Sequence, residues 1–552
     1  MPTSTDPAPP SSRSLSRRHF TTRMALSSLG IAAGFPAILK GQDEKQPEPE
    51  KSVTLSILHT TDLHGHILPT STYEGEGDLG GLARCATQVR QWQTQNPNNI
   101  LIDIGDVYQG THVSRMTGGQ VMIDLFNKLN YDAWVIGNHE LDWGLEPLAN
   151  AVEKSRALVL GSNAQYGGMW TTSLKDKSNP LGKIAPYIIK EVAGFRVGII
   201  GSVTPGLPAW LHPGLLSEFS AADPLKSVQF AIRRLQEAKV DAIVLAAHFG
   251  LKGAQGKGVP DDFANRIHEV TKACPELAVV IAGHTHKDIP DFKVNGIPYT
   301  QGNYYGINCG RVDLVFDAGS RKLQSTKLNS VRMDKSIAPD PMVLSASAKH
   351  LDASKAVLAT VAGKLETSLP CRPPVPGAAS PALLLITRAI RHGLQKRGVT
   401  VDGVLHGLFQ EDKDLPAGPK TVGDIWDIIP YENRLATADI RGSDLTPLME
   451  EMLSSAHSTH ALDGFKLTVE GERSKLKVTS LTFPDGRPID PEKRYTIALN
   501  AYDAQSGGRR YELLHELVIQ SKAKFTLHAQ ESRDALVEFF TDKKVIKTAD
   551  LA

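Results

Sequence analysis

Short apolar runs recur along the first part of the chain, and each ends in a small turn followed by polar residues. The runs are rich in β-branched residues and predict buried strands at 53–59, 99–104, 132–136, 240–247 and 277–282. Apolar positions at helical spacing predict helices at 80–93, 120–129 and 261–271. Because strands alternate with helices, this half of the chain is expected to form a layered α/β domain.

The second half has a different pattern. Residues 340–363 are rich in Ala and Ser with few breaks, which predicts a helix that joins two domains. An amphipathic helix is expected at 381–398, followed by helix, strand and helix at 421–428, 434–440 and 444–453. Residues 464–500 are strand-rich, with a turn at 483–486. We therefore expect an α+β domain here.

Composition narrows the class of protein. At 552 residues, with 41% hydrophobic and 22% charged residues, the chain is ordinary globular protein with more than one domain. The formal charge of +1 gives no reason to expect a nucleic-acid polymer as partner. The four cysteines lie far apart without a CxxC pair, which argues against a thiolate zinc site. One disulfide and four buried thiols both remain open.

The N-terminus resembles a twin-arginine export signal. Arg17 and Arg18 precede Phe20 and the weakly apolar stretch 24–39, which is short for a membrane span of about 20 residues. We expect a signal at 1–40, cleaved near Ala37, with the export machinery as a partner and a periplasmic or extracellular location. The alternative is a disordered basic tail before a loose helix. Residues 41–52 are expected to be a polar linker.

Residues able to bind metal follow each predicted strand. They are Asp62 and His64, Asp106, Asn138 and His139, His248, and His284 and His286. Asp62 and His64 are two apart, so in extended chain they are expected to project to one side. Ligands of α/β sheets gather beyond the carboxyl ends of the strands, so these side chains are expected to form one two-metal centre.

Other polar residues near these strand ends are read differently. A lone histidine after a strand is usually a packing residue, and His59 and His112 receive that interpretation. Asp103 and Glu140 are assigned structural roles, because Asp103 lies within its strand and Glu140 is expected to point away from the site. For His66 a structural and a functional role both remain open.

The segments HTTDLHGH, LGGLAR, DIGDVYQGT, GNHELDWG, AHFG and GHTH, in this order, resemble the calcineurin-like metallophosphoesterases, specifically the 5′-nucleotidase family. The resemblance implies a four-layer αββα metallophosphoesterase domain at 53–335, a linking helix at 336–363 and a smaller α+β 5′-nucleotidase-type C-terminal domain at 364–552. It also implies two divalent ions as cofactors. Nitrogen and oxygen ligands suit manganese, zinc, iron or cobalt, with manganese favoured.

The resemblance also implies a role for each motif residue. One ion would be held by Asp62, His64, Asp106 and His286, and the other by Asp106, Asn138, His248 and His284. Many relatives carry glutamine at the position of His286. His139 and Asp142 would form the catalytic pair, with His139 as acid or charge stabiliser and Asp142 orienting it.

The resemblance weakens in the second half. TVGDIWDIIPYENRL and YTIALNAYDAQSGGRRY are similar to the family's substrate-binding segments. However, the family's Asn-Gly-Gly-x-x-Arg segment is replaced by LHGLFQ at 405–410, so a phosphate-binding arginine is missing there, and the usual GGDGY has become GGRRY. The first of two base-stacking aromatics has no clear counterpart near 459–465. Tyr502 is expected to stack on the substrate or to be a core residue. Arg509, Arg510 and Arg434 are expected to hold phosphate, with a solvated loop pair as the alternative for the first two.

These patterns predict an exported di-metal phosphoesterase that hydrolyses a small nucleotide or related organic phosphate by metal-activated hydroxide attack. One alternative is a thiosulfohydrolase-like enzyme of sulfur oxidation that uses the same di-metal site. An alternative of another class is a surface binding protein with a vestigial metal site, and the full set of candidate ligands argues against it.

Overall fold

The computed structural model describes residues 52–171, 179–253, 260–375, 377–409, 414–454, 458–471 and 476–551, so the predicted export signal lies outside the described residues. Within these ranges, the first half contains two six-stranded sheets. The first has the order β15-β14-β1-β2-β3-β4 and comprises β1 (Ser52–Thr60), β2 (Asn99–Asp103), β3 (Ala133–Val135), β4 (Leu158–Leu160), β14 (Asn308–Asp317) and β15 (Leu323–Arg332). The second has the order β12-β13-β11-β10-β8-β7 and comprises β7 (Tyr187–Val192), β8 (Phe195–Val203), β10 (Ala242–His248), β11 (Val279–Ala282), β12 (Asp288–Val294) and β13 (Ile297–Gly302).

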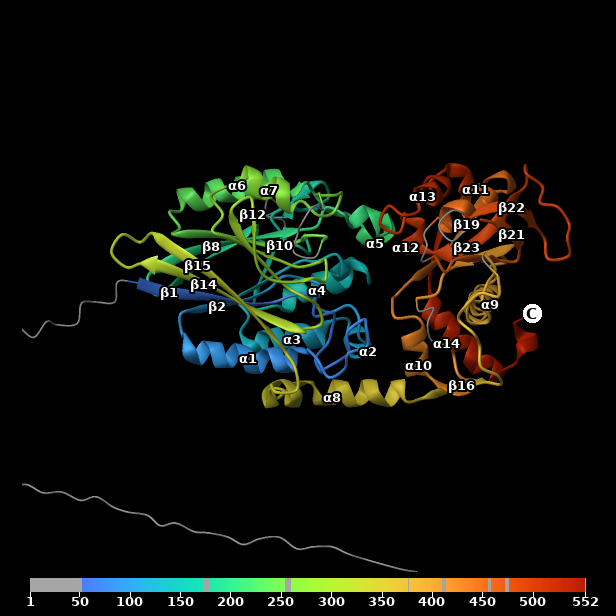
Figure 1. Ribbon diagram of the computed structural model, residues 1–552, viewed down its shortest axis with the longest axis horizontal. Coiled ribbons are helices and arrows are strands. Elements are labelled where there is room, and N and C mark those ends of the chain that lie inside the picture. The colour runs from blue at the N-terminus through green and yellow to red at the C-terminus, as the bar shows by residue number, and fades with distance from the viewer. Residues whose placement is uncertain are drawn as a thin grey trace, which may run out of the picture. The chain divides into compact units, whose positions relative to one another are not determined.

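Alternating side chains sort the apolar residues into layers. Ile57 of β1 and Val244 of β10 belong to the cluster between the two sheets, whereas Leu58 and Leu245, one residue further along each strand, face the helices. Helices α1 (Leu82–Gln95) and α3 (Gln120–Leu129) cover one outer face, and α6 (Pro224–Glu237) and α7 (Ile267–Ala273) cover the other (Figure 1). The expected four-layer αββα arrangement is therefore confirmed.

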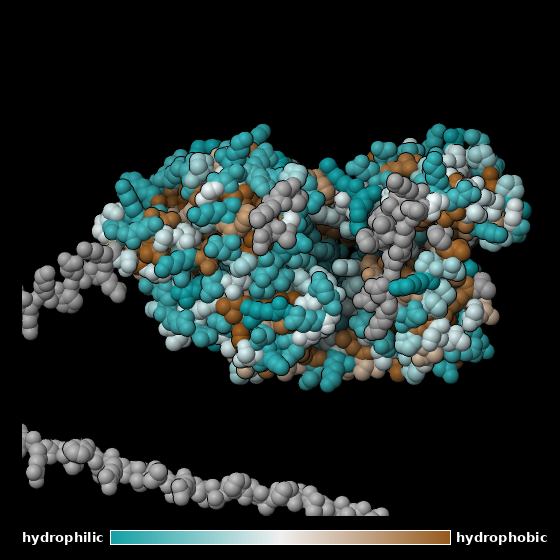
Figure 2. Space-filling view, viewed as in Figure 1, coloured by the Kyte–Doolittle hydropathy of each residue, from teal (hydrophilic) through white to brown (hydrophobic). Residues whose placement is uncertain are grey.

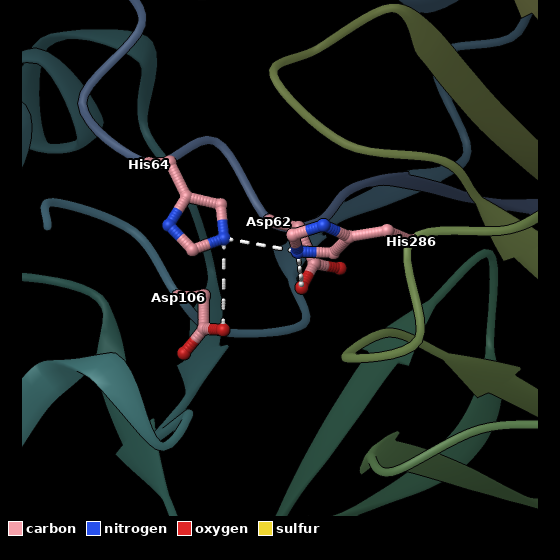
Figure 3. Close-up of side chains that lie close together, drawn as sticks. All are labelled: Asp62, His64, Asp106 and His286. Carbon is pink, nitrogen blue, oxygen red and sulfur yellow. Dashed lines mark hydrogen bonds and ion pairs between the residues drawn. The ribbon is translucent and has the colours of Figure 1, made fainter. Parts of the chain in front are cut away.

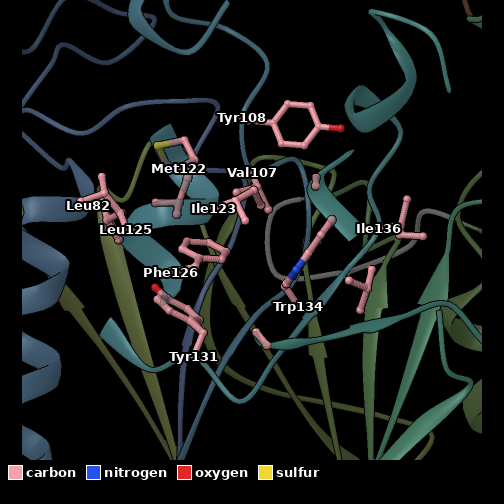
Figure 4. Close-up of a cluster of buried hydrophobic side chains, with 14 of the residues drawn as sticks. Leu82, Val107, Tyr108, Met122, Ile123, Leu125, Phe126, Tyr131, Trp134 and Ile136 are labelled. Atoms are coloured by element: carbon pink, nitrogen blue, oxygen red, sulfur yellow. The ribbon is translucent and has the colours of Figure 1, made fainter. Parts of the chain in front are cut away.

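The core under α3 shows how tightly the first layer is filled. Trp134 of β3 and Phe126 of α3 are fully buried, and the ring of Phe126 stacks on Tyr131 with centroids 4.0 Å apart (Figure 4). The indole nitrogen of Trp134 donates a hydrogen bond to Ser155, so this large side chain is buried with its polar atom satisfied. Shorter elements complete this half: α2 (His112–Met116), α4 (Leu145–Lys154), α5 (Pro213–Leu216), β5 (Ala164–Tyr166), β6 (Met169–Trp170) and β9 (Phe219–Ala221).

The second half is built around a five-stranded sheet of order β20-β17-β23-β19-β24. Its strands are β17 (Gly403–His406), β19 (Arg434–Arg441), β20 (Ala461–Asp463), β23 (Arg494–Asn500) and β24 (Thr526–Glu531). Helices α9 (Pro381–Lys396) and α14 (Ser532–Lys543) pack on one apolar cluster, and α11 (Gly442–Met452) and α13 (Glu512–Val518) on another. The remaining elements are β16 (Val361–Leu365), β18 (Gly418–Thr421), β21 (Lys466–Glu470), β22 (Lys477–Thr482), β25 (Val545–Ile546), α8 (Pro341–Leu358), α10 (Val422–Ile428) and α12 (Ala501–Ala504).

Two predicted helices are shorter than expected. The helix predicted at 261–271 begins only at Ile267, because Asp262 accepts the backbone N–H groups of Ala264 and Asn265 and holds the preceding residues in a turn. The helix predicted at 340–363 ends at Leu358. Its last residues instead belong to strand β16, which pairs with β18.

Surface and cysteine chemistry are ordinary. Hydrophilic residues cover most of the face that Figure 2 shows, with hydrophobic ones scattered among them. Of the helices in the described ranges, not one combines the length and the hydropathy that crossing a membrane requires. All four cysteines are buried, which favours the second of the two interpretations left open.

Candidate metal centre

The turns after the strands adopt an unusual backbone. Asp62, His64 and Asp106 have φ angles of 49°, 48° and 54°, in the left-handed region that residues other than glycine rarely adopt. Backbone hydrogen bonds of 2.9 Å from Asp62 to Gly105 and from His64 to Asp106 hold the two turns together. The expectation that Asp62 and His64 project to one side of extended chain is therefore wrong, although the two side chains do converge. Left-handed residues clustered at strand ends are typical of functional sites.

The first group of candidate ligands is Asp62, His64, Asp106 and His286, whose ligand atoms lie within 4.8 Å of one another (Figure 3). The Nδ1 atom of His64 lies 3.0 Å from the backbone oxygen of Gln109, which can only accept, so Nδ1 carries the proton. Its unprotonated Nε2 then faces Nε2 of His286 at 3.1 Å.

These nitrogens and the neighbouring carboxylates lie close enough together to bind one cation. Nε2 of His286 lies 3.4 Å from Asp62 Oδ1, and Nε2 of His64 lies 3.7 Å from Asp106 Oδ2. Burial lowers the pKa of His64 to about 3, so this imidazole stays neutral at neutral pH and keeps the electron pair of Nε2 for a ligand role. The donor set fits a divalent ion.

The second group contains Asp106 again, with His248 and His284. His248 donates from Nδ1 to the backbone oxygen of Ile104 at 2.7 Å, so its Nε2 is the atom that faces Asp106 Oδ2 at 3.1 Å. The amide oxygen of Asn138 lies 3.2 Å from this Nε2 and 2.8 Å from Nδ1 of His284. Because Asp106 is shared, it stands where a bridging carboxylate is required in a two-metal site.

The negative charge of Asp106 raises the pKa of the neighbouring His248. Burial lowers the pKa of His248, but the charge of Asp106 and the contact with it outweigh burial and raise the value to about 9. A proton on His248 therefore balances the negative charge of Asp106, as a bound cation would.

His139 and Asp142 form a pair beside the two groups. Nδ1 of His139 lies 2.6 Å from Asp142 Oδ2, and the backbone N–H of His139 donates to Asp106 Oδ1 at 2.9 Å. Burial opposes protonation of His139, but the charges of Asp142 and Asp106 outweigh it and raise the pKa to about 10. These charges favour the imidazolium form of His139, which can donate a hydrogen bond or a proton.

Glu140 holds the two loops together from below. Its fully buried carboxylate accepts the backbone N–H groups of Asp106, Val107 and Gly137 at 3.0, 2.8 and 2.6 Å. Burial and then the charge of Asp106 raise the pKa of Glu140 to about 7, while the N–H groups act in the opposite direction. The contacts show what the structural role expected for Glu140 consists of.

The other polar residues near the strands have structural contacts. Asp103 accepts from Thr60 and from the backbone of Gly105, and His112 lies 2.8 Å from the Ser354 hydroxyl. His59 is fully buried and neither of its ring nitrogens has a hydrogen-bond partner among the described residues. The ring of His66 stacks on Tyr305 at 3.8 Å and belongs to neither ligand group.

A cavity of about 400 Å³ lies over the candidate ligands. Asp106, Asn138, His139, His284 and His286 are among the residues on one side. The other side comes from the second half of the chain and includes Phe409, Tyr431, Arg434, Tyr502 and Arg510. The cavity thus joins the candidate metal centre to a wall of aromatic and cationic side chains.

The four predicted substrate-binding residues differ in position. Arg434, Tyr502 and Arg510 line the cavity, and a guanidinium nitrogen of Arg510 donates to the Tyr502 hydroxyl at 3.1 Å. Arg509 does not line it, because its guanidinium lies 4.6 Å from the ring centroid of Phe263.

Aromatic residues that the sequence did not single out also reach the cavity. They are Trp210, Phe409 and Tyr431, and the last two rings lie 5.4 Å apart. Tyr431 stands in the segment PYENRL and Phe409 in the segment 405–410, both of which were compared with substrate-binding segments of the family, whereas Trp210 carries no local signal.

A chain of hydrogen bonds connects the first metal group to the second half of the chain. The backbone oxygen and the side-chain oxygen of Gln109 both contact Nδ1 of His64. The side-chain nitrogen of Gln109 donates to Glu432 at 2.6 Å. Glu432 in turn accepts from the buried guanidinium of Arg533 at 3.1 Å. The position of one candidate ligand is thereby tied to the wall that would bind substrate.

Two family models match the chain. Residues 55–288 match the calcineurin-like phosphoesterases, and residues 361–516 match the 5′-nucleotidase C-terminal domain. Snake venom 5′-nucleotidase from Crotalus adamanteus is 26% identical over 504 residues, covering 84% of this chain and 83% of the relative. Endonuclease YhcR from Bacillus subtilis is 25% identical over 92% of this chain, which spans 41% of that protein. Several curated relatives are likewise matched over about half of their length or less.

Solved structures share the fold. The structure of a 5′-nucleotidase precursor from Thermus thermophilus has a TM-score of 0.64 and 24% identity, over 90% of this chain and 97% of that one. The sulfate thiohydrolase SoxB from Thermus thermophilus has a TM-score of 0.59 and 16% identity, over 89% and 95%. At such identities the likeness concerns the fold alone.

Proposed function

Since the chain belongs to the calcineurin-like phosphoesterases that carry a 5′-nucleotidase C-terminal domain, a family of phosphoric ester hydrolases, we propose that it hydrolyses a nucleotide or a related small organic phosphate. The observation that carries the proposal is the sharing of Asp106 by two ligand groups that open into one cavity with His139. The 5′-nucleotidases and 2′,3′-cyclic-nucleotide phosphodiesterases among the relatives support this substrate class.

In this proposal Asp62, His64, Asp106 and His286 hold one divalent ion, and Asp106, Asn138, His248 and His284 hold the second. When bound, such ions neutralise the phosphate and acidify a water molecule that attacks phosphorus. Manganese is favoured among the metals that this donor set suits.

The chain's own side chains then have distinct tasks. His139, an imidazolium held by Asp142 at Nδ1, donates from Nε2 to a phosphate oxygen or protonates the leaving group. Arg434 and Arg510 attract the phosphate, because a guanidinium group can form bidentate hydrogen bonds with two phosphate oxygens. Tyr502 offers a flat ring to the leaving group.

Hydrolysis is tested on the purified full chain with manganese. The substrates are 5′-AMP, a 2′,3′-cyclic nucleotide, UDP-glucose and bis-p-nitrophenyl phosphate. Phosphate or phenolate release is expected, and Asp106→Ala should abolish it and reduce bound metal. Asp124→Ala removes an exposed carboxylate on α3 and is the matched control. If the wild-type chain leaves all four substrates intact, the proposal is wrong.

The thiosulfohydrolase alternative stays a prediction, because the likeness to SoxB concerns the fold alone. Turnover of any of the four phosphate substrates would also dismiss the binding-protein alternative.

We also propose export by the twin-arginine route to the periplasm or beyond. The support is the pair Arg17 and Arg18 before the apolar stretch. Replacing both with lysine should leave the protein in the cytoplasm of a host with this route. Unchanged export of that variant would contradict the proposal.

A further inference from the structure

Tyr73 lies on a loop between β1 and α1, closed by the pairing of Thr70 with Leu79. Its side chain is 55% exposed, yet it has defined contacts. The ring stacks on Tyr304 with centroids 4.3 Å apart, and the backbone N–H of Tyr73 donates to the Tyr304 hydroxyl at 3.1 Å. The hydroxyl of Tyr73 lies 3.0 Å from Nδ1 of His286.

The two nitrogens of His286 face different partners. Nε2 points to Asp62 Oδ1 and to His64, as Figure 3 shows, and Nδ1 points to Tyr73. An imidazole that gives Nε2 to a cation carries its proton on Nδ1, and a phenol oxygen can accept a hydrogen bond from that N–H group. The contact therefore supplies an acceptor for Nδ1–H in the tautomer in which Nε2 is free to ligate.

Comparison with the imidazoles of His64 and His248 shows what is different about the contact of Tyr73. His64 and His248 are held at Nδ1 by backbone oxygens, of Gln109 and Ile104, which no side-chain substitution removes. His286 is held by a side chain. Second partners of this kind orient metal ligands, and their loss typically weakens metal binding by roughly 10–100-fold.

We propose that Tyr73 is a positioning residue that holds His286 in the tautomer and orientation needed to bind a divalent ion. The inference rests on the two-metal site of the proposed function, but not on the identity of the substrate. The competing reading is an exposed tyrosine that only packs on Tyr304, and Tyr73→Phe separates the two because it keeps the ring and removes the hydroxyl.

The test measures metal binding directly. The full-length chain is stripped with chelator and titrated with cobalt, and both the visible absorption and the number of bound ions are recorded. Tyr73→Phe should weaken one of two binding steps by roughly tenfold and change the spectrum of that step. The control is Tyr187→Phe, which removes a hydroxyl from a half-buried tyrosine of β7 and should match wild type.

A double-mutant cycle tests whether Tyr73 acts through His286. In a His286→Gln background, Tyr73→Phe should have no further effect on cobalt affinity. An equal loss in both backgrounds would refute the inference, and so would a Tyr73→Phe variant that binds both ions with wild-type affinity and spectrum. Since cobalt binding is read without substrate, a chain that binds cobalt in this way but hydrolyses none of the phosphoesters would sink the proposed function alone.

Discussion

The loops that carry Asp106 and Asn138 depend on the buried carboxylate of Glu140, and its removal is the sharpest test of how the site is built. Glu140→Ala would leave three buried backbone N–H groups, of Asp106, Val107 and Gly137, without their acceptor. An unsatisfied buried donor costs about 1–3 kcal/mol. Since the three share one carboxylate and are not independent, we expect a loss of about 4 kcal/mol in the free energy of unfolding.

Glu140→Gln is the milder change. Its amide keeps one acceptor oxygen but turns an NH₂ group toward backbone N–H donors, so at least one hydrogen bond is lost. We expect a loss of about 2 kcal/mol, and for both variants weaker metal binding, because the same N–H groups fix the loops of Asp106 and Asn138.

The assay is urea unfolding of the metal-free proteins, which separates loop stability from the linkage of stability to bound metal. Metal content after reconstitution is measured in parallel. Glu146→Ala, at an exposed position in the first turn of α4, is the control and should stay within about 0.5 kcal/mol of wild type. A Glu140→Ala protein that unfolds within about 1 kcal/mol of wild type would refute the reasoning, because the measured loss would be below that of even one unsatisfied donor.

Three further predictions concern the site. Gly137→Ala would place a Cβ 2.5 Å from the backbone nitrogen of Asp106, so kcat should fall by at least ~100-fold with loss of bound metal. A wild-type kcat would contradict this prediction. In steady-state kinetics, Arg510→Ala should raise KM by about tenfold, whereas Arg509→Ala should leave KM within about twofold of wild type. Equal effects on KM would mean that lining the cavity does not distinguish the two arginines. Gln109→Ala removes the hydrogen bond to Glu432 but keeps the backbone oxygen that holds His64, so kcat/KM should fall by roughly tenfold at unchanged metal content. A loss of bound metal in this variant would contradict the prediction.

Local patterns were sufficient for the strands and for most helices. The helix predicted at 120–129 has those bounds in the structure, and the strand predicted at 53–59 is β1, one residue longer at each end. These predictions work because alternation and helical spacing record which face of an element is buried. The helix predicted at 261–271 was wrong at its start because side-chain bonds of Asp262 compete with the helix there, and spacing does not reveal such bonds.

The candidate ligands show both sides of the comparison. Their residue types and their places after successive strands were sufficient to expect that His248 and His286 would converge, because the parallel strands β10 and β11 end at the same edge of one sheet. Asp62 follows β1 of the other sheet, so its approach to them depends on how the two sheets pack. Their roles as ligands stay predictions. The left-handed backbone at Asp62 and His64 was not foreseen, since it depends on hydrogen bonds to a turn more than forty residues away.

The amino-acid order thus specifies the residue types of the candidate ligands, the predicted pair His139 and Asp142, and the layered fold, since each motif and each element consists of residues close together in the chain. Packing decides the rest: Tyr73 meets His286 across 213 positions, and Gln109 meets Glu432 across 323. Packing likewise brings Arg510 into the cavity and sends its neighbour Arg509 to Phe263. Such contacts form only when distant segments are brought together by the burial of apolar surface, which no local spacing records.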